Sequence, residues 1–136
     1  MTKFILASAF ALILSASLHS VEAFAYSSYP SCGDAKVLNK ISKRFNQAEN
    51  DTWYRGIHMD SISRPHGHDR SGFEDSPIYR QYCHAYANLS NGKSPKVYYL
   101  IEEGMGLAGF GWNVEFCVTG LDPWRVYDGY CRTVRP

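Results

Sequence analysis

Residues 96–118, "KVYYLIEEGMGLAGFGWNVEFCV", decide the fold, because two apolar segments flank a glycine-rich stretch. Gly104, Gly106 and Gly109 match the G-x-G-x-x-G pattern of dinucleotide sites. In such a site the last glycine opens a helix whose N-terminus receives the pyrophosphate. Here residues 110–118 alternate between apolar and other side chains, which predicts a strand. The stretch therefore predicts a β-hairpin closed by a glycine loop, and no nucleotide or other cofactor is expected.

The rest of the chain predicts an α+β domain. Residues 31–50 carry an apolar stripe at helical spacing, and Ser31 and Asp34 have the spacing of a capping box, so we expect Ser31 to cap this helix. Strands are expected at 52–62, 78–89, 96–103 and 110–118, a last and bent strand at 124–134, and a long loop at 63–77. We expect the single N-terminal helix to cover one face of an antiparallel meander of four to five strands, with two disulfides.

The first 25 residues predict a secretory signal peptide. Lys3 supplies a positive start, residues 4–18 form an uncharged apolar run, and Ala23-Phe24-Ala25 fits a cleavage site between small residues. We therefore expect residues 26–136 to form a single exported domain, periplasmic or secreted, with no transmembrane segment after cleavage.

The four cysteines are expected to form two disulfides, since an even number in a small exported domain is typical of a disulfide framework. None of their spacings is C-x-x-C, which argues against a zinc site. Cys83 alternates with small and apolar residues and Cys117 with polar ones, which favours the pairs Cys32–Cys83 and Cys117–Cys131. A tight turn at Asn91-Gly92 would instead exchange the two faces of the strand that holds Cys83.

Charge and composition exclude some partners. The chain has 14 basic and 13 acidic residues, and its net charge of +1 gives no electrostatic reason to expect nucleic-acid binding. Ten Tyr, seven Phe and three Trp indicate a folded, β-rich protein rather than a disordered one.

Metal binding is one chemical hypothesis. His66, His68 and Asp69 lie in the expected long loop, and alternate residues of an extended segment can point to one ion. With His58 or His84 as a further ligand, the cluster predicts a small metal-dependent or acid–base hydrolase as an alternative function. Polar loops also contain such histidine pairs without any metal.

Two segments are candidates for binding a partner. Met105 and Leu107 lie at the tip of the glycine loop. Trp124, Arg125 and Tyr127 are of residue types that dominate protein-binding hot spots. The alternatives are that the loop tip closes the core and that the aromatic residues pack over a disulfide.

Residues 98–132, "YYLIEEGMGLAGFGWNVEFCVTGLDPWRVYDGYCR", resemble the C-terminal half of a family of small exported bacterial proteins of unassigned function. The resemblance includes the positions of Cys83, Cys117 and Cys131. It implies a Gram-negative periplasmic location and brings no catalytic or binding residues. We expect a binding module, without catalysis, that acts on a protein or envelope component. A further alternative is a structural envelope-stability factor.

Overall fold

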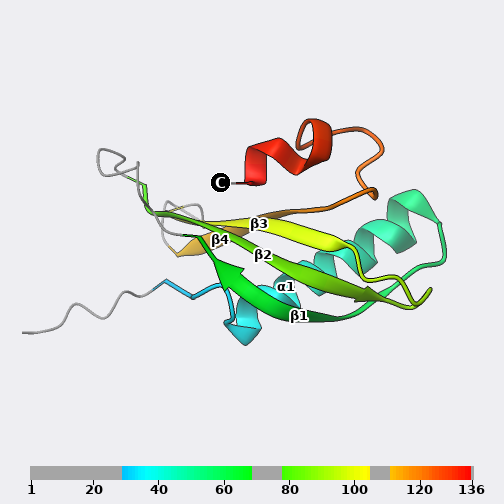
Figure 1. Cartoon of the computed structure of the whole chain (residues 1–136), viewed down its shortest axis with the longest axis horizontal. Coiled ribbons are helices and arrows are strands. Elements are labelled where there is room, and N and C mark those ends of the chain that lie inside the picture. The colour runs from blue at the N-terminus through cyan, green and yellow to red at the C-terminus, as the bar shows by residue number, and fades with distance from the viewer. Residues whose placement is uncertain (1–28, 69–77, 105–110, 136) are drawn as a thin grey trace, which may run out of the picture.

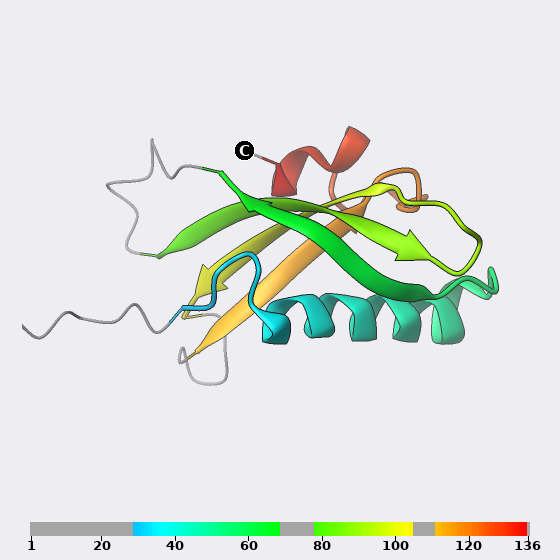
Figure 2. The ribbon, with the colours of Figure 1, turned by 60° about the horizontal axis from the view of Figure 1, so that its bottom comes forward.

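The computed structural model describes residues 29–68, 78–104 and 111–135. It has a helix α1 (Ala35–Ala48) that continues into a π-helical turn η1 (Glu49–Trp53), then four strands and a short 3₁₀ helix η3 (Gly129–Val134) (Figure 1). The strands are β1 (Met59–Gly67), β2 (Arg80–Leu89), β3 (Lys96–Glu103) and β4 (Trp112–Val118). Figure 2 shows α1 along one face of the sheet and η3 on the other. The α+β prediction is confirmed, with four strands.

The sheet is an antiparallel meander in the order β1-β2-β3-β4. In β3 and β4, Val97 pairs with Val118 and Tyr99 with Phe116, so the two strands form a hairpin. Gly104 closes it by donating its N–H to the carbonyl oxygen of Gly111 at 2.7 Å. The strand–helix unit that a dinucleotide site requires does not form here, as the alternation after the glycines predicted.

Helix α1 buries Val37, Ile41 and Phe45 against the sheet, because residues four apart lie on the same side of a helix. The expected cap at Ser31 is wrong. Asp34 is the N-cap, and its carboxylate accepts a 2.8 Å hydrogen bond from the backbone N–H of Lys36. Ser31 lies one turn too early, since its carbonyl accepts from the N–H of Asp34 in the turn that leads into the helix.

Two apolar clusters lie on the two faces of the sheet. The larger cluster fills the space between α1 and the sheet, and Tyr99 at its centre is fully buried. Its phenol donates a 2.8 Å hydrogen bond to the carbonyl oxygen of Cys32, which ties the start of α1 to β3. The smaller cluster is built from Leu100, Cys117, Cys131 and Val134 with three partly buried tyrosines, Tyr82, Tyr98 and Tyr127. It holds η3 against the face opposite α1.

Both favoured disulfides, Cys32–Cys83 and Cys117–Cys131, are present. The alternative strand register is wrong, because Cys83 pairs with Tyr99 rather than with a residue of the opposite face. Leu89 donates its N–H to the carbonyl oxygen of Lys93, so three residues rather than two form the turn. Gly92 takes the left-handed conformation, with φ of 78°, that such a turn needs.

The first strand begins later than predicted. Residues 49–53 continue the helix as a π-helical turn, and β1 starts at Met59 and extends into the expected loop. The side chain of Asn46 fixes this start, because it accepts from the N–H of Met59 at 2.7 Å and donates to its carbonyl at 3.2 Å. β2 then supplies the partner strand.

The predicted last strand at 124–134 is also wrong. This part of the chain forms turns followed by η3. The carboxylate of Asp122 accepts hydrogen bonds of 3.1 Å from the N–H groups of Val126 and Tyr127, which replaces a strand ladder by a turn. The disulfide to Cys117 then brings Cys131 back over β4.

Within the described ranges, no helix is long and apolar enough to cross a membrane. The expected signal peptide, residues 1–25, lies outside these ranges.

Candidate binding pocket

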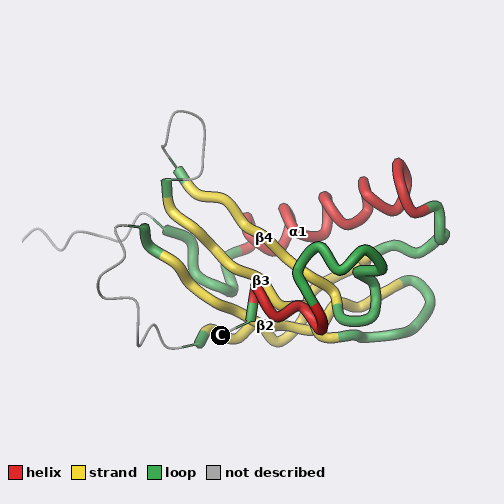
Figure 3. Tube along the Cα trace, turned by 90° about the horizontal axis from the view of Figure 1, so that it is seen from above, coloured by secondary structure: helices red, strands yellow, loops and turns green. Residues whose placement is uncertain are grey.

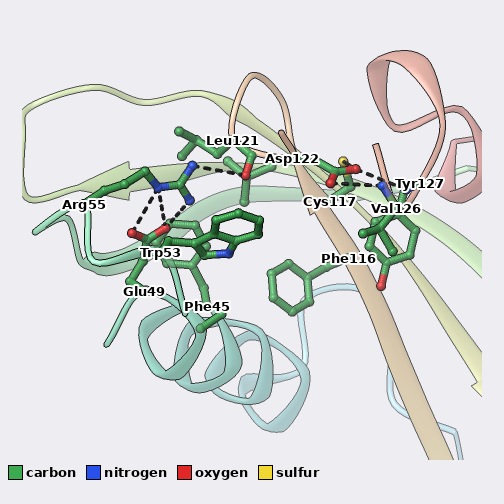
Figure 4. Close-up of a pocket in the computed structure, with 12 residues that line it drawn as sticks. Phe45, Glu49, Trp53, Arg55, Phe116, Cys117, Leu121, Asp122, Val126 and Tyr127 are labelled. Atoms are coloured by element: carbon green, nitrogen blue, oxygen red, sulfur yellow. Dashed lines mark hydrogen bonds and ion pairs between the residues drawn. The ribbon is translucent and has the colours of Figure 1, made fainter. Parts of the chain in front are cut away.

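An apolar pocket of about 160 Å³ lies between the end of α1 and the segment that follows β4 (Figure 4). We call it the tryptophan pocket. Its walls include six large apolar side chains: Phe45, Trp53, Phe116, Leu121, Val126 and Tyr127. It lies at one end of the larger cluster, so its floor is continuous with the core.

The π-helical turn η1 places Trp53 at this pocket. Tyr54 follows Trp53, and its left-handed conformation (φ 50°) ends the π-helical turn. The N–H of Tyr54 bonds the carbonyl oxygen of Glu49 at 2.8 Å, which closes the wider π-type turn.

An ion pair between buried Glu49 and partly exposed Arg55 supports the pocket. Glu49 is only 2% exposed, and Arg55 donates from Nε to both of its carboxylate oxygens at 3.1 Å (Figure 4). The Nη2 group of Arg55 bonds the same carboxylate, and its Nη1 reaches the carbonyl oxygen of Leu121 at 3.4 Å. Arg55 therefore connects the turn after α1 to the turn after β4.

Two exposed apolar side chains border the pocket. Trp124 lies against Trp53, with ring centroids 4.4 Å apart, yet it is 70% exposed. Val126 is 65% exposed, although it also lines the pocket. Single exposed apolar residues are ordinary, but a group of them beside an apolar pocket is typical of an interaction site.

The backbone of the segment next to the pocket, from Arg125 to Cys131, is strained. Arg125, Asp128, Tyr130 and Cys131 all have φ between 52° and 61°, a conformation that favours glycine. Each such residue costs roughly 1–3 kcal/mol and persists only when its surroundings hold it. Here the disulfide Cys117–Cys131 holds the segment at one end. At the other end, hydrogen bonds from backbone N–H groups to the carboxylate of Asp122 hold it. Strain of this kind clusters at binding and catalytic sites.

The structure places some of the predicted partner-binding residues at or beside this pocket, and their role in binding stays a prediction. Tyr127 lines it, Trp124 covers Trp53, and Arg125 is exposed in the adjoining turn. Met105 and Leu107 lie outside the described residues. The prediction missed Trp53 and the Glu49–Arg55 pair, because no local pattern indicates that this turn meets the segment after β4.

The histidines lie elsewhere, on the sheet face opposite α1. The rings of His66, His68 and His84 have centroids 4.8 to 5.8 Å apart, and His68 Nε2 lies 2.7 Å from His84 Nδ1. Asp69 is not among the described residues. In the ranges that are described, no three His, Cys, Asp or Glu side chains are arranged to hold a metal ion, and His58 lies before the start of β1, away from the cluster. The metal hypothesis stays a prediction.

Comparison with known proteins identifies no relative. No family model matches the chain, and neither a curated protein nor a solved structure matches it. The resemblance to small exported bacterial proteins stays an expectation, and the geometry of the pockets is the basis for inferring a function.

Proposed function

We propose that this protein is a small exported binding module that receives one large apolar side chain of a protein partner in the tryptophan pocket. The observation that carries the proposal is an apolar pocket bordered by Trp124 and Val126, both of which are largely exposed. Trp and Arg are the residue types that contribute most to protein-binding hot spots, and Arg55 lines the same pocket.

The size of the pocket supports a single side chain as the occupant. Pockets for drug-sized molecules enclose roughly 300–1,000 Å³, whereas this one encloses about 160 Å³. An aromatic or branched aliphatic side chain presented by an extended segment matches both the volume and the apolar walls. The exposed Trp124 and Val126 beside the pocket then provide area for the flanking residues of the partner.

The carboxylates at the pocket support binding rather than acid–base chemistry. Glu49 is engaged by Arg55 through both of its oxygens. Asp122 is engaged by the backbone N–H groups of Val126 and Tyr127. Both groups therefore act on the shape of the pocket, and a pocket that is already formed loses less conformational entropy when a partner binds.

Export is part of the proposal. Two disulfides are present, and disulfides persist in oxidising compartments such as the periplasm and the extracellular space. The expected signal peptide and the implied Gram-negative setting agree with this location.

The experiment that tests the function uses two readouts. N-acetyl-phenylalanine amide and N-acetyl-leucine amide are titrated into the protein and followed by NMR, with N-acetyl-serine amide as the control. We expect saturable shifts confined to Trp53, Phe116, Val126 and their neighbours. Shifts spread over the surface, or equal shifts with the serine compound, would contradict the proposal.

The second readout is photocrosslinking in intact cells. A photoreactive phenylalanine analogue replaces Val126 in one variant and Tyr130 in the control variant. Tyr130 is 86% exposed and lies in the same segment, but it does not line the tryptophan pocket. We expect a discrete crosslinked protein from position 126 and none from position 130. The same products from both positions would show nonspecific contact.

A further inference from the structure

A second pocket, of about 270 Å³, lies on the sheet face opposite α1. We call it the cationic pocket, and it is lined by His68, His84, Lys96, Tyr98, Arg132 and Arg135. Figure 3 shows η3 on this face of the sheet, and η3 packs on β3 and β4. The cationic pocket opens beside η3, on a part of the face that η3 does not cover.

The strand register brings these side chains together. His84 pairs with Tyr98 across β2 and β3, and with His66 across β1 and β2. Lys96 lies two residues before Tyr98 and so points to the same face. Arg132 and Arg135 come from the other layer, at and after the end of η3.

The charged side chains that line the cationic pocket are all positive. Among the described residues that line it, none is acidic and three carry a permanent positive charge. Arg132 is paired with Asp128, to which its Nε donates at 2.9 Å. Lys96 Nζ and Arg135 Cζ each lie 5.7 Å from the centre of the Tyr98 ring, so both cations border the same space. Positive charges grouped in this way repel one another, and a bound anion offsets that repulsion.

Arg135 gives an independent indication of a missing partner. Its Nε atom is buried and has no hydrogen-bond partner among the described residues. A buried N–H group without an acceptor is costly, and native structures normally supply one. Arg135 lines the cationic pocket, and its guanidinium group would have to turn for an anion in the pocket to accept a hydrogen bond from the buried Nε.

The histidine pair contributes a donor whichever tautomer is present. In the 2.7 Å contact between His68 Nε2 and His84 Nδ1, one nitrogen donates and the other accepts. The accepting ring carries its own proton on its second nitrogen, because a neutral imidazole has one N–H. The pair therefore keeps one further N–H group for a ligand.

We propose that the cationic pocket binds the phosphate group of a small phosphomonoester. Lysine, arginine and imidazole N–H groups approach from β2, from β3, from the residue after β1 and from η3 with its following residue. Such a set matches an oxyanion with several acceptor oxygens and two negative charges. The Tyr98 ring forms an apolar part of the wall against which the organic part of the ligand lies. A divalent metal ion would prefer carboxylates to these positively charged neighbours.

Anion binding in the cationic pocket would also change the pKa of His84. The pKa of His84 is lowered, first by desolvation and then by the charges of His68, Lys96 and His66. Arg132 and Arg135 face it from the layer of η3, and Tyr98 faces it from β3. A bound anion opposes these charges, so it should raise the pKa of His84.

The test titrates the disulfide-bonded protein with inorganic phosphate, phenyl phosphate, zinc ions and vesicles of phosphatidylglycerol, in separate calorimetric experiments. We expect saturable binding of both phosphates, tighter for phenyl phosphate, and weaker binding at higher salt. NMR should show the titration of the His84 ring moving to higher pH when phenyl phosphate is bound.

Single substitutions test whether phenyl phosphate binds in the cationic pocket. Lys96→Gln and Arg135→Gln should each weaken phenyl phosphate binding at least tenfold. Lys36→Gln, an exposed lysine on α1 at the other face of the sheet, should leave the affinity unchanged. Two substitutions in the pocket keep the test informative if one variant fails to fold.

Three results would overturn the proposal: no saturable phosphate binding, binding to vesicles alone, or zinc binding that phosphate does not weaken. None of them depends on the tryptophan pocket, so the two proposals fail separately.

Discussion

The indole ring of Trp124 lies against the indole ring of Trp53, with centroids 4.4 Å apart and planes at 57°. Trp53 ends the π-helical turn after α1, and Trp124 belongs to the turn after β4. The contact holds a largely exposed tryptophan in one place beside an apolar pocket. A rigid, exposed aromatic ring is well suited to bind a partner, because little conformational entropy is lost on binding.

Replacing Trp124 by alanine should abolish the saturable NMR shifts with N-acetyl-phenylalanine amide. The free energy of unfolding should fall by only about 0.5–1.5 kcal/mol, since an exposed aromatic pair is worth little more than its contact. Urea denaturation and the NMR titration measure the two effects. Tyr130→Ala is the matched control and should keep the binding; equal affinity of Trp124→Ala and the unchanged protein would place the binding site elsewhere.

Replacing both Cys117 and Cys131 by serine should lower the free energy of unfolding by about 3 kcal/mol, because this disulfide closes a loop with a sequence separation of 14. The left-handed residues between Arg125 and Cys131 should then relax, and the tryptophan pocket should lose affinity for its probes. Denaturation and the probe titration are the measurements.

The other disulfide provides the control. The bridge between Cys32 and Cys83 has a sequence separation of 51 and joins the segment before α1 to β2. Serine at both positions should cost more stability, about 4 kcal/mol from the longer loop, yet leave the affinity of the folded protein for the probes unchanged. If both double variants lost affinity equally, the role of Cys117–Cys131 in holding the pocket would be refuted.

Replacing Arg55 by glutamine should destabilise the protein by about 1–3 kcal/mol, because it leaves a buried carboxylate without its charged hydrogen-bond partner. The side chain of Glu49 is 1% exposed, whereas that of Arg55 is 29% exposed. Adding Glu49→Gln should recover a large part of the loss, since a neutral amide is less costly to bury than a charge. Thermal denaturation of the two single variants and the double variant measures the coupling, and additive losses would argue against it.

The stability of the protein should decrease on acidification below about pH 6.5. The pKa of His84 is lowered from 6.5 by desolvation and nearby positive charge, so the unfolded chain takes up this proton at a higher pH than the folded one. Stability therefore rises with pH between the folded and unfolded pKa values and is full above the unfolded value.

The measurement for His84 is the free energy of unfolding across this pH range. His84→Gln should flatten part of the decrease, and His58→Gln, outside the cluster, should leave it in place. A decrease that is identical in His84→Gln would exclude this histidine as its source.

Much of the fold follows from local sequence. Helical spacing of Val37, Ile41 and Phe45 predicts α1, and alternation after Gly109 predicts β4 and excludes a dinucleotide site. Alternation within each of the strands that hold Cys83 and Cys117 favours opposite faces for the two cysteines, and thereby the observed disulfides. These features are local because the periodicity of a helix or strand is set within a few residues.

The binding regions depend on contacts between distant segments. Residues 124–134 have the composition of a strand, but Asp122 and the Cys117–Cys131 bridge fold them into turns and η3. His84 meets Lys96 and Arg135 only through the strand register and the docking of η3. The sequence by itself determined the helix and the hairpin, because the periodicity of each is set within a few residues. Only the tertiary structure decided which face of the sheet Cys83 occupies and where both pockets lie. The pockets are lined by segments that are distant in the sequence, and these meet through strand pairing, disulfide bridging and packing rather than through local periodicity.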